Sequence, residues 1–220
     1  MPYPQPAFNR IARALGVPVF KFLMMTLCQV KVMGLENVPP YGPYFIAFNH
    51  VDTLDAPLVV LFWPYPPEGV TAAENFSKLN VGLLMRLYGP IPLKRTAYDR
   101  EALEKGLAVI KAGSPLIVAP EGTRRRQAGM QEAKPGLAFL AHKSGASIIP
   151  VGLTGTENWI PSWKRFRRPR LTMTIGKPLC LPEVTLTHEN RRGVLEEHTT
   201  LIMKRIAELL PPEYRGVYGE

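Results

Sequence analysis

Residues 44–55 read YFIAFNHVDTLD, an apolar run followed by a polar segment and the beginning of a second apolar stretch. The unbroken apolar run at 44–48 is typical of a buried strand. Asp52 or Thr53 can cap a helix over residues 54–62, because their side chains accept hydrogen bonds from the N–H groups at a helix start. A buried strand that turns directly into a helix indicates an α/β fold.

The same segment places a histidine and an aspartate five residues apart, at His50 and Asp55. On one continuous helix, five residues turn the chain by about 500°, so the two side chains would point apart. With His50 in a turn before the helix, Asp55 could bond the imidazole Nδ1–H and leave Nε2 free to take a proton from a hydroxyl. Two interpretations stay open at this point: an acid–base pair, or a strand-end histidine beside aspartates that only cap the helix.

The rest of the chain alternates between short apolar runs and amphipathic segments. Its length of 220 residues suits one domain with an ample core. We expect a mixed, largely parallel sheet flanked by helices on both faces. The expected strands lie near residues 44–48, 70–73, 90–93, 116–119, 148–152 and 171–175, and the expected helices near 54–62, 99–112, 136–143 and 189–210.

The N-terminal segment, residues 7–32, mixes apolar residues with four basic ones. Gly16 and Pro18 predict two short helices, and the uncharged stretches are too short to span a bilayer. We therefore expect an amphipathic two-helix element over residues 1–32 that lies in one leaflet of a membrane, ahead of an α/β domain at 33–220. Alternatively, its apolar residues cover the core of the domain itself. The side chains expected to dip into the lipid are Phe20, Phe22, Leu23, Met24 and Met25.

The formal net charge of +9 predicts an anionic partner, and both nucleic acid and anionic lipid qualify. Residues 158–170 interleave tryptophan with arginine and lysine, which suits a lipid headgroup region, a solvated loop or single-stranded nucleic acid, in that order of preference. Two distant cysteines, Cys28 and Cys180, give no disulfide framework and favour a reducing compartment. The motifs G-x-S-x-G, H-E-x-x-H, C-x-x-C and G-x-x-x-x-G-K do not occur.

Three further strings follow the first in the chain: GPIPLKR at 89–95, LIVAPEGTR at 116–124 and SIIPVG at 147–152. In this order the four strings resemble the sequence blocks of the glycerolipid acyltransferase family, over about residues 10 to 180. The resemblance implies that an acyl group moves from acyl-CoA or acyl-carrier protein to a hydroxyl of a glycerolipid. It implies 1-acyl-sn-glycerol 3-phosphate as the acceptor and phosphatidic acid as the product.

The resemblance also assigns roles to individual residues. His50 matches the catalytic base and Asp55 its orienting partner. The residues matched to substrate binding are Arg95, Glu121, Gly122, Thr123 and Arg124, of which the arginines would hold the phosphate of the acceptor, and the further candidates are Asn49, Lys94 and Pro150. Asp52, Pro92, Ala119 and Lys94 depart from the usual family pattern, which affects the identity of the acceptor more than the reaction.

A thioester is already an activated acyl donor, so we expect neither a metal nor a cofactor beyond the acyl-CoA or acyl-carrier protein co-substrate. The expected partners are a membrane surface and a phosphorylated acceptor, not nucleic acid. The expected location is the cytoplasmic face of the membrane, peripheral or monotopic. The alternatives are an enzyme for glycerol 3-phosphate or another lysolipid, a catalytically silent membrane-binding module of the same fold, and a basic nucleic-acid-binding protein.

Overall fold

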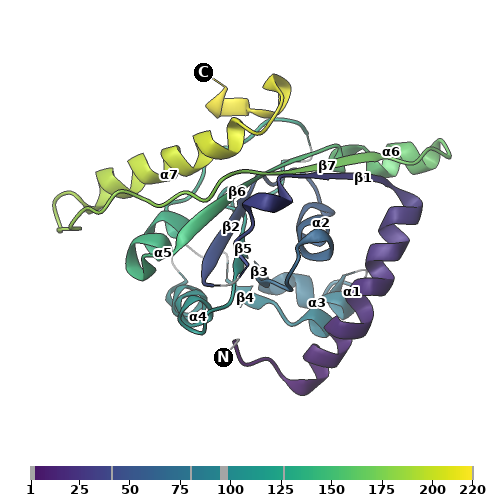
Figure 1. Cartoon of the computed structure of the whole chain (residues 1–220), viewed down its shortest axis with the longest axis horizontal. Coiled ribbons are helices and arrows are strands. Elements are labelled where there is room, and N and C mark those ends of the chain that lie inside the picture. Colours follow the sequence, from purple (N-terminus) through teal and green to yellow (C-terminus); the bar gives the residue numbers. More distant parts are fainter. Residues whose placement is uncertain (1–2, 41, 80, 95–98, 126, 220) are drawn as a thin grey trace.

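One mixed β-sheet organises the chain, and its central strands come from the apolar runs of the sequence (Figure 1). The structure is a computed structural model that describes residues 3–40, 42–79, 81–94, 99–125 and 127–219. Within them the strands form a seven-stranded sheet in the order β1-β7-β6-β2-β5-β3-β4. The strands are β1 Gln29–Met33, β2 Tyr44–Phe48, β3 Glu68–Ala72, β4 Ile91–Leu93, β5 Leu116–Val118, β6 Ser147–Thr154 and β7 Arg170–Ile175.

Helices cover both faces of the sheet, with α4, α5 and α7 on one face and α1, α2 and α3 on the other (Figure 1). The described helices are α1 Ala7–Leu27, α2 Asp55–Phe62, α3 Gly82–Tyr88, α4 Arg100–Lys111, α5 Gly136–Ser144, α6 Trp159–Lys164 and α7 Arg191–Ala207. Short 3-10 helices occupy Leu35–Asn37, Ala73–Phe76, Thr156–Asn158, Pro212–Tyr214 and Gly216–Tyr218.

The central strand β2 contributes to two hydrophobic cores, because alternate residues of a strand point to opposite faces. Phe45 and Ala47, both fully buried, belong to the core that contains residues of α4, α5 and α7. Tyr44, Ile46 and Phe48 belong to the second core, which contains residues of α2. This double burial explains why every residue of the run at 44–48 is apolar.

The directions of the strands decide where a site can form. β2 pairs in parallel with β5 and β6, and β3 pairs in parallel with β5 and β4. Their carboxyl ends therefore open at one edge of the sheet, which we call the carboxyl edge. β7 runs antiparallel to β6, and β1 follows β7. Ligands of open α/β sheets gather at the carboxyl edge, and the polar segment after β2 begins there.

The expected fold class is confirmed, and each expected strand has a counterpart within about two residues. β1 was not expected: the segment assigned to a membrane element supplies an edge strand of the sheet, in register with β7. The boundary drawn between residues 32 and 33 therefore falls inside a strand.

The expectation of two N-terminal helices was wrong, because α1 is one helix of 21 residues with Pro18 inside it. Proline removes the hydrogen bond to the carbonyl four residues earlier, here that of Ala14. Ala14 and Pro18 are both exposed, so water can solvate that carbonyl and the helix continues. The expectation that Met24 dips into the lipid was also wrong, because this side chain packs against the second core.

The inner face of α1 is polar and fastened to the domain. The guanidinium of Arg13 donates two hydrogen bonds of 2.8 Å to the Glu68 carboxylate at the start of β3, and both side chains are buried. Arg13 Nε also donates to the carbonyl oxygen of Tyr88, at 2.7 Å. Asn9 donates to the carbonyl oxygens of Arg86 and Leu87 at the end of α3.

The outer face of α1 is apolar. Phe8, Ile11, Leu15, Val19 and Phe22 follow one another at helical spacing and are each between 61% and 73% exposed. A helix that buries polar groups and exposes a stripe of large apolar ones is the reverse of an ordinary surface helix. None of the helices in the described ranges is both long and apolar enough to span a membrane.

Candidate active site

The turn between β2 and α2 brings His50 and Asp55 together at the carboxyl edge. His50 Nδ1 lies 2.9 Å from Asp55 Oδ2. The chain bends between them, because β2 ends at Phe48 and α2 begins at Asp55. The bend predicted from the spacing of five residues is therefore present.

The Asp55 carboxylate is fully buried and accepts hydrogen bonds from four groups. Its Oδ2 accepts from the imidazole Nδ1 and from the backbone N–H groups of Val51 and Asp52, at 2.6 and 2.7 Å. Its Oδ1 accepts from Thr156 Oγ1 at 2.5 Å, a residue just beyond β6. These bonds fix both oxygens, so Asp55 can hold the imidazole in one orientation.

The hydrogen bond to Asp55 assigns the tautomer of His50. Because Oδ2 already accepts two backbone N–H groups, it acts as an acceptor, and the shared proton lies on Nδ1. Nε2 is then an acceptor, and it has no protein partner among the described residues. The Phe48 ring meets the imidazole edge-on, with ring centres 5.7 Å apart. The His50 side chain is 20% exposed, so the imidazole is partly accessible to a substrate.

Glu121, near the start of the loop after β5, holds the backbone of the turn between β2 and α2 (residues 49–54), which we call the histidine turn. One carboxylate oxygen accepts from the backbone N–H of His50 at 2.8 Å, and the other accepts from that of Gln131 at 2.9 Å. Burial raises the pKa of the Glu121 carboxyl, and these two backbone donors partly oppose the shift. Glu121 was expected to bind substrate, but one of its oxygens is engaged with the His50 backbone and the other with that of Gln131.

Asn49 and Pro150, two of the three further candidates from the sequence, are buried at the sheet and are not exposed as substrate ligands would be. The fully buried Asn49 side chain donates to the Leu153 carbonyl oxygen at 2.9 Å and accepts from the Leu153 N–H at 2.7 Å. It therefore ties the end of β2 to the end of β6. Pro150 lies buried within β6, opposite Ala47 of β2, and so cannot reach a substrate at the carboxyl edge.

The loop after β5 supplies the basic group nearest the histidine turn. Arg124 Nη1 donates to Thr53 Oγ1 at 2.6 Å, which places the guanidinium beside the turn that carries His50. Gly122 adopts a positive φ of 71°, which lets the loop fold back, and its N–H bonds the Ala119 carbonyl at 3.1 Å. Gly122 and Thr123 are exposed, so both are accessible to a ligand.

The second basic string of the sequence is described only in part. Lys94 is exposed just after β4, and its backbone N–H donates to Asp99 Oδ2 at 2.6 Å. Arg95, which the resemblance matches to acceptor binding, lies outside the described residues. The strand that precedes it ends at the carboxyl edge.

Asp52 does not cap α2 as expected. Residue 54 occupies the cap position of this helix, and no side chain bonds its first N–H groups. One oxygen of Asp52 instead accepts from the indole Nε1 of Trp159 at 3.0 Å and from the N–H of Thr53 at 2.5 Å. The histidine turn is thereby linked to α6.

Comparisons with known proteins identify the family of the chain. The sequence profile of the acyltransferase family matches residues 29–154, more than half of the chain and the part that carries the histidine turn. The chain belongs to the acyltransferase family. The profile also contains the loop with Glu121 and Arg124 and every described strand except β7.

Two relatives of the chain carry the same enzyme name. The chain is 31% identical over 196 residues to a 1-acyl-sn-glycerol-3-phosphate acyltransferase of Chlamydomonas reinhardtii, covering 86% of this chain and 55% of that protein. It is 28% identical over 151 residues to the enzyme of that name from Borreliella burgdorferi, covering 63% of this chain and 60% of that one. The chain thus spans roughly half to three-fifths of the length of these relatives.

A solved structure shows the same fold. The 1-acyl-sn-glycerophosphate acyltransferase PlsC from Thermotoga maritima superposes with a TM-score of 0.63 at 23% identity, over 90% of this chain and 82% of that chain. The similarity thus extends beyond the profile match to most of the chain. The two proteins therefore share their fold.

Two residues of the site escaped the sequence analysis, namely Thr156 and Trp159. Thr156 lies 101 positions from Asp55, and no local spacing relates the two. The only feature of the sequence that could have indicated Thr156 is its position just after an expected strand, β6, which runs parallel to β2. Trp159 was assigned to a lipid-facing segment, although its indole points to Asp52.

Proposed function

We propose that this chain transfers an acyl group from an acyl thioester to a hydroxyl of a glycerolipid, most specifically 1-acyl-sn-glycerol 3-phosphate, which yields phosphatidic acid. The observation that carries the proposal is the His50–Asp55 pair at the carboxyl edge, whose imidazole is partly exposed and whose Nε2 has no partner among the described residues. This acceptor is the substrate for which the Chlamydomonas reinhardtii and Borreliella burgdorferi relatives are named.

The geometry suits a direct transfer. His50 Nε2 takes the proton of the acceptor hydroxyl while the oxygen bonds to the thioester carbonyl carbon. Asp55 stabilises the imidazolium that forms, through the bond to Nδ1–H. The tetrahedral intermediate then expels the thiolate, which takes the proton from the imidazolium. An ester and a free thiol result, the base is regenerated, and no covalent enzyme intermediate is needed.

Arg124 is the candidate ligand of the acceptor phosphate, together with Arg95. A guanidinium can donate two parallel hydrogen bonds to phosphate oxygens, which a lysine cannot reproduce. Arg124 lies beside the histidine turn, so a phosphate held there would bring the neighbouring hydroxyl toward His50. Acyl-CoA and acyl-carrier protein both fit as donors, since each presents a thioester.

The proposed location is the membrane surface on the cytoplasmic side, with α1 lying in one leaflet. Its apolar stripe, its polar inner face and the Arg13–Glu68 pair support this location. A helix fastened in this way would hold the carboxyl edge at a fixed height above the lipid. The chain would then meet a lipid acceptor without leaving the membrane.

A panel of acceptors tests the proposed reaction. Purified protein would be incubated with labelled acyl-CoA, or labelled acyl-carrier protein, and with glycerol 3-phosphate, 1-acyl-sn-glycerol 3-phosphate or lysolipids that lack a free phosphate. We expect label in phosphatidic acid. Transfer only to glycerol 3-phosphate or to a phosphate-free lysolipid would correct the acceptor. Retention on vesicles without transfer to any acceptor would show a catalytically silent membrane module.

A further inference from the structure

Helix α6 connects the candidate site to the end of α1. Trp159 at its start donates to Asp52, and Trp163 one turn later donates its indole N–H to the Leu27 carbonyl oxygen at 3.2 Å. The two indole rings meet edge to face, with centres 5.0 Å apart. The position of α6 is thus fixed both by the histidine turn and by the last turn of α1.

The residues that follow form an exposed projection, which we call the α6 tip (residues 164–167). Phe166 is fully exposed, and its φ of 53° lies in the left-handed region that a residue with a Cβ rarely adopts. The N–H of Arg167 donates to the Ser162 carbonyl oxygen at 2.9 Å and closes the end of the helix. In helix endings of this kind, glycine is usual at the position that Phe166 occupies. An aromatic ring in this place contributes nothing to the packing of the domain.

Three basic residues flank Phe166 in the sequence. Lys164, Arg165 and Arg167 are all exposed, and none of them belongs to an ion pair within the described part of the chain. The next arginine, Arg168, behaves differently, because it donates to the carbonyl oxygen of Cys28 at 2.7 Å and so anchors the projection against α1. The charges of the tip are therefore free to meet an external partner.

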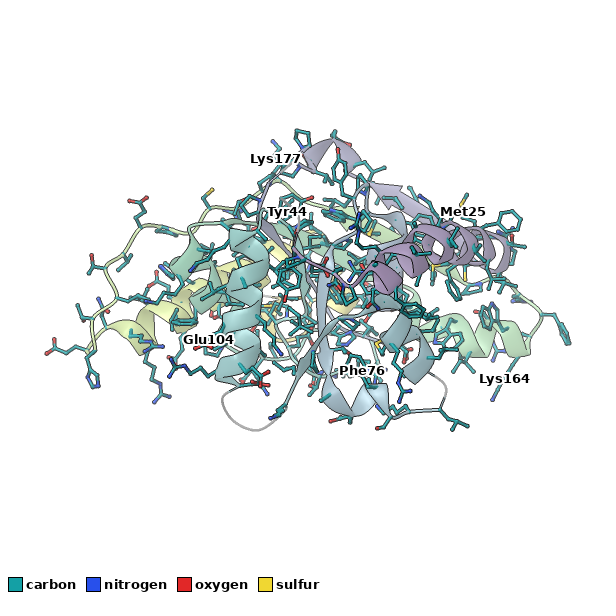
Figure 2. All side chains as sticks on the ribbon, turned by 90° about the horizontal axis from the view of Figure 1, so that it is seen from below. Met25, Tyr44, Phe76, Glu104, Lys164 and Lys177 are labelled. Atoms are coloured by element: carbon teal, nitrogen blue, oxygen red, sulfur yellow. The ribbon has the colours of Figure 1, made fainter. Side chains whose placement is uncertain are left out.

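The tip lies beside the apolar stripe of α1. In Figure 1 α6 and the carboxyl end of α1 occupy the same end of the molecule, and in Figure 2 Met25 and Lys164 lie at one end as well. Exposed apolar side chains come from both helices there: Phe22 and Met25 from α1, and Ile160 from α6. The basic, aromatic tip and the end of the apolar stripe thus lie at the same end of the molecule.

We propose that the α6 tip is a second membrane anchor, in which Phe166 enters the interface while the three flanking basic side chains bind anionic phospholipid headgroups. The inference rests on the membrane location proposed above and adds a partner of stated chemistry. Basic residues near an anionic surface attract it, and aromatic rings favour the interface. With α1, the tip would hold the carboxyl edge toward the lipid at two points.

The chemistry of the tip favours a bilayer over the other polyanions. Nucleic acid and acidic proteins would also attract the three basic side chains. Neither explains why a ring in a strained backbone position is left in water next to an apolar stripe. A bilayer takes up all three features at once.

Binding to vesicles of defined composition tests the anchor. The full chain would be sedimented with phosphatidylcholine vesicles that contain or lack phosphatidylglycerol. Each basic residue near an anionic surface is worth roughly a fivefold change in binding, so Lys164→Gln, Arg165→Gln and Arg167→Gln together should weaken binding to the anionic vesicles roughly a hundredfold. Phe166→Gly should weaken binding to both vesicle types without lowering the melting temperature, because glycine tolerates the positive φ.

The control is a triple variant with the same net charge, Lys111→Gln, Lys143→Gln and Lys204→Gln, whose positions lie on α4, α5 and α7. Equal loss of binding in both triple variants would overturn the anchor and leave only a net-charge effect. Binding of the tip to DNA or to an acidic carrier protein, with no loss on vesicles, would overturn it as well.

Acyl transfer to a short-chain, monomeric acceptor separates the anchor from the proposed function. The tip variants should keep this activity and lose activity on an acceptor embedded in vesicles. A chain that binds vesicles through its tip but transfers no acyl group would retain the anchor and refute the function. Normal acyl transfer together with unchanged vesicle binding in the tip variants would support the proposed function and refute the anchor.

Discussion

Thr156 donates a hydrogen bond of 2.5 Å to Oδ1 of Asp55, although the two residues lie 101 positions apart in the chain. Both groups are fully buried, so neither can exchange the partner for water. The bond connects the carboxyl end of β6 to the aspartate that orients His50. We interpret Thr156 as a positioning residue for the base.

Removal of the Thr156 hydroxyl should lower turnover. In Thr156→Val the shape is nearly kept, but Asp55 Oδ1 loses its donor, which predicts a loss of about 1 to 3 kcal/mol in stability and roughly a tenfold fall in kcat. Thr156→Ser keeps the hydroxyl and should restore kcat with a small loss of packing. Equal kcat values for the valine and serine variants would show that the hydroxyl does not position the base.

The raised pKa of Glu121 predicts how stability depends on pH. Burial makes the folded chain bind this proton more tightly than the unfolded chain, so the unfolding free energy should fall as pH rises from the ordinary glutamic acid range through the higher folded value. Glu121→Gln removes the titrating group. Urea denaturation of both proteins across that pH range should show the wild-type chain losing stability relative to the variant. A difference that stays constant or rises with pH would contradict the assignment.

Arg124→Lys tests the phosphate site. The lysine keeps the charge but not the fork of donors, so KM for a phosphorylated acceptor should rise by the equivalent of about 1 to 3 kcal/mol while KM for the acyl donor stays nearly constant. The matched control is Thr53→Val, which removes the one protein partner of the Arg124 guanidinium seen in the described residues. If Thr53→Val reproduces the whole effect, Arg124 serves to hold the loop.

The membrane role of α1 is best tested by substitution, because deletion of residues 1–30 would leave Glu68 buried without Arg13 and remove part of β1. Leu15→Gln with Phe22→Gln should release the chain from vesicles and leave the melting temperature nearly unchanged, since both side chains are exposed. The control Val184→Gln with Val217→Gln changes two exposed apolar residues elsewhere. Release by both pairs, or by neither, would argue against α1 as the membrane contact.

Local patterns predicted the parts of the fold that depend on neighbours in the sequence. The run at 44–48 is apolar because β2 is buried on both faces, and the offset between His50 and Asp55 required the bend that is present. β1 was missed because an edge strand alternates apolar and exposed polar residues over only five positions. The continuity of α1 was missed because an interior proline usually breaks or kinks a helix, whereas here the carbonyl of Ala14 that Pro18 leaves without its helix partner is on the exposed side.

The contacts that organise the site are mostly long-range, and no single string encodes them. Glu121 matched a family block, but its partner is the backbone N–H of a residue 71 positions away. Trp159 was interpreted as part of a lipid-facing segment, but its indole donates to Asp52, which lies 107 positions away in the chain. Such contacts depend on which strand ends share the carboxyl edge, and strand order emerges only when the sheet assembles.

The turnover of wild-type, His50→Ala and Asp52→Asn proteins, with labelled acyl-CoA and 1-acyl-sn-glycerol 3-phosphate, decides whether His50 is the base. We predict that His50→Ala lowers kcat by about two to four orders of magnitude with an unchanged circular dichroism spectrum. Asp52→Asn, which alters the neighbouring carboxyl group outside the dyad, should lose much less. Wild-type turnover in the folded His50→Ala variant would contradict the proposed mechanism.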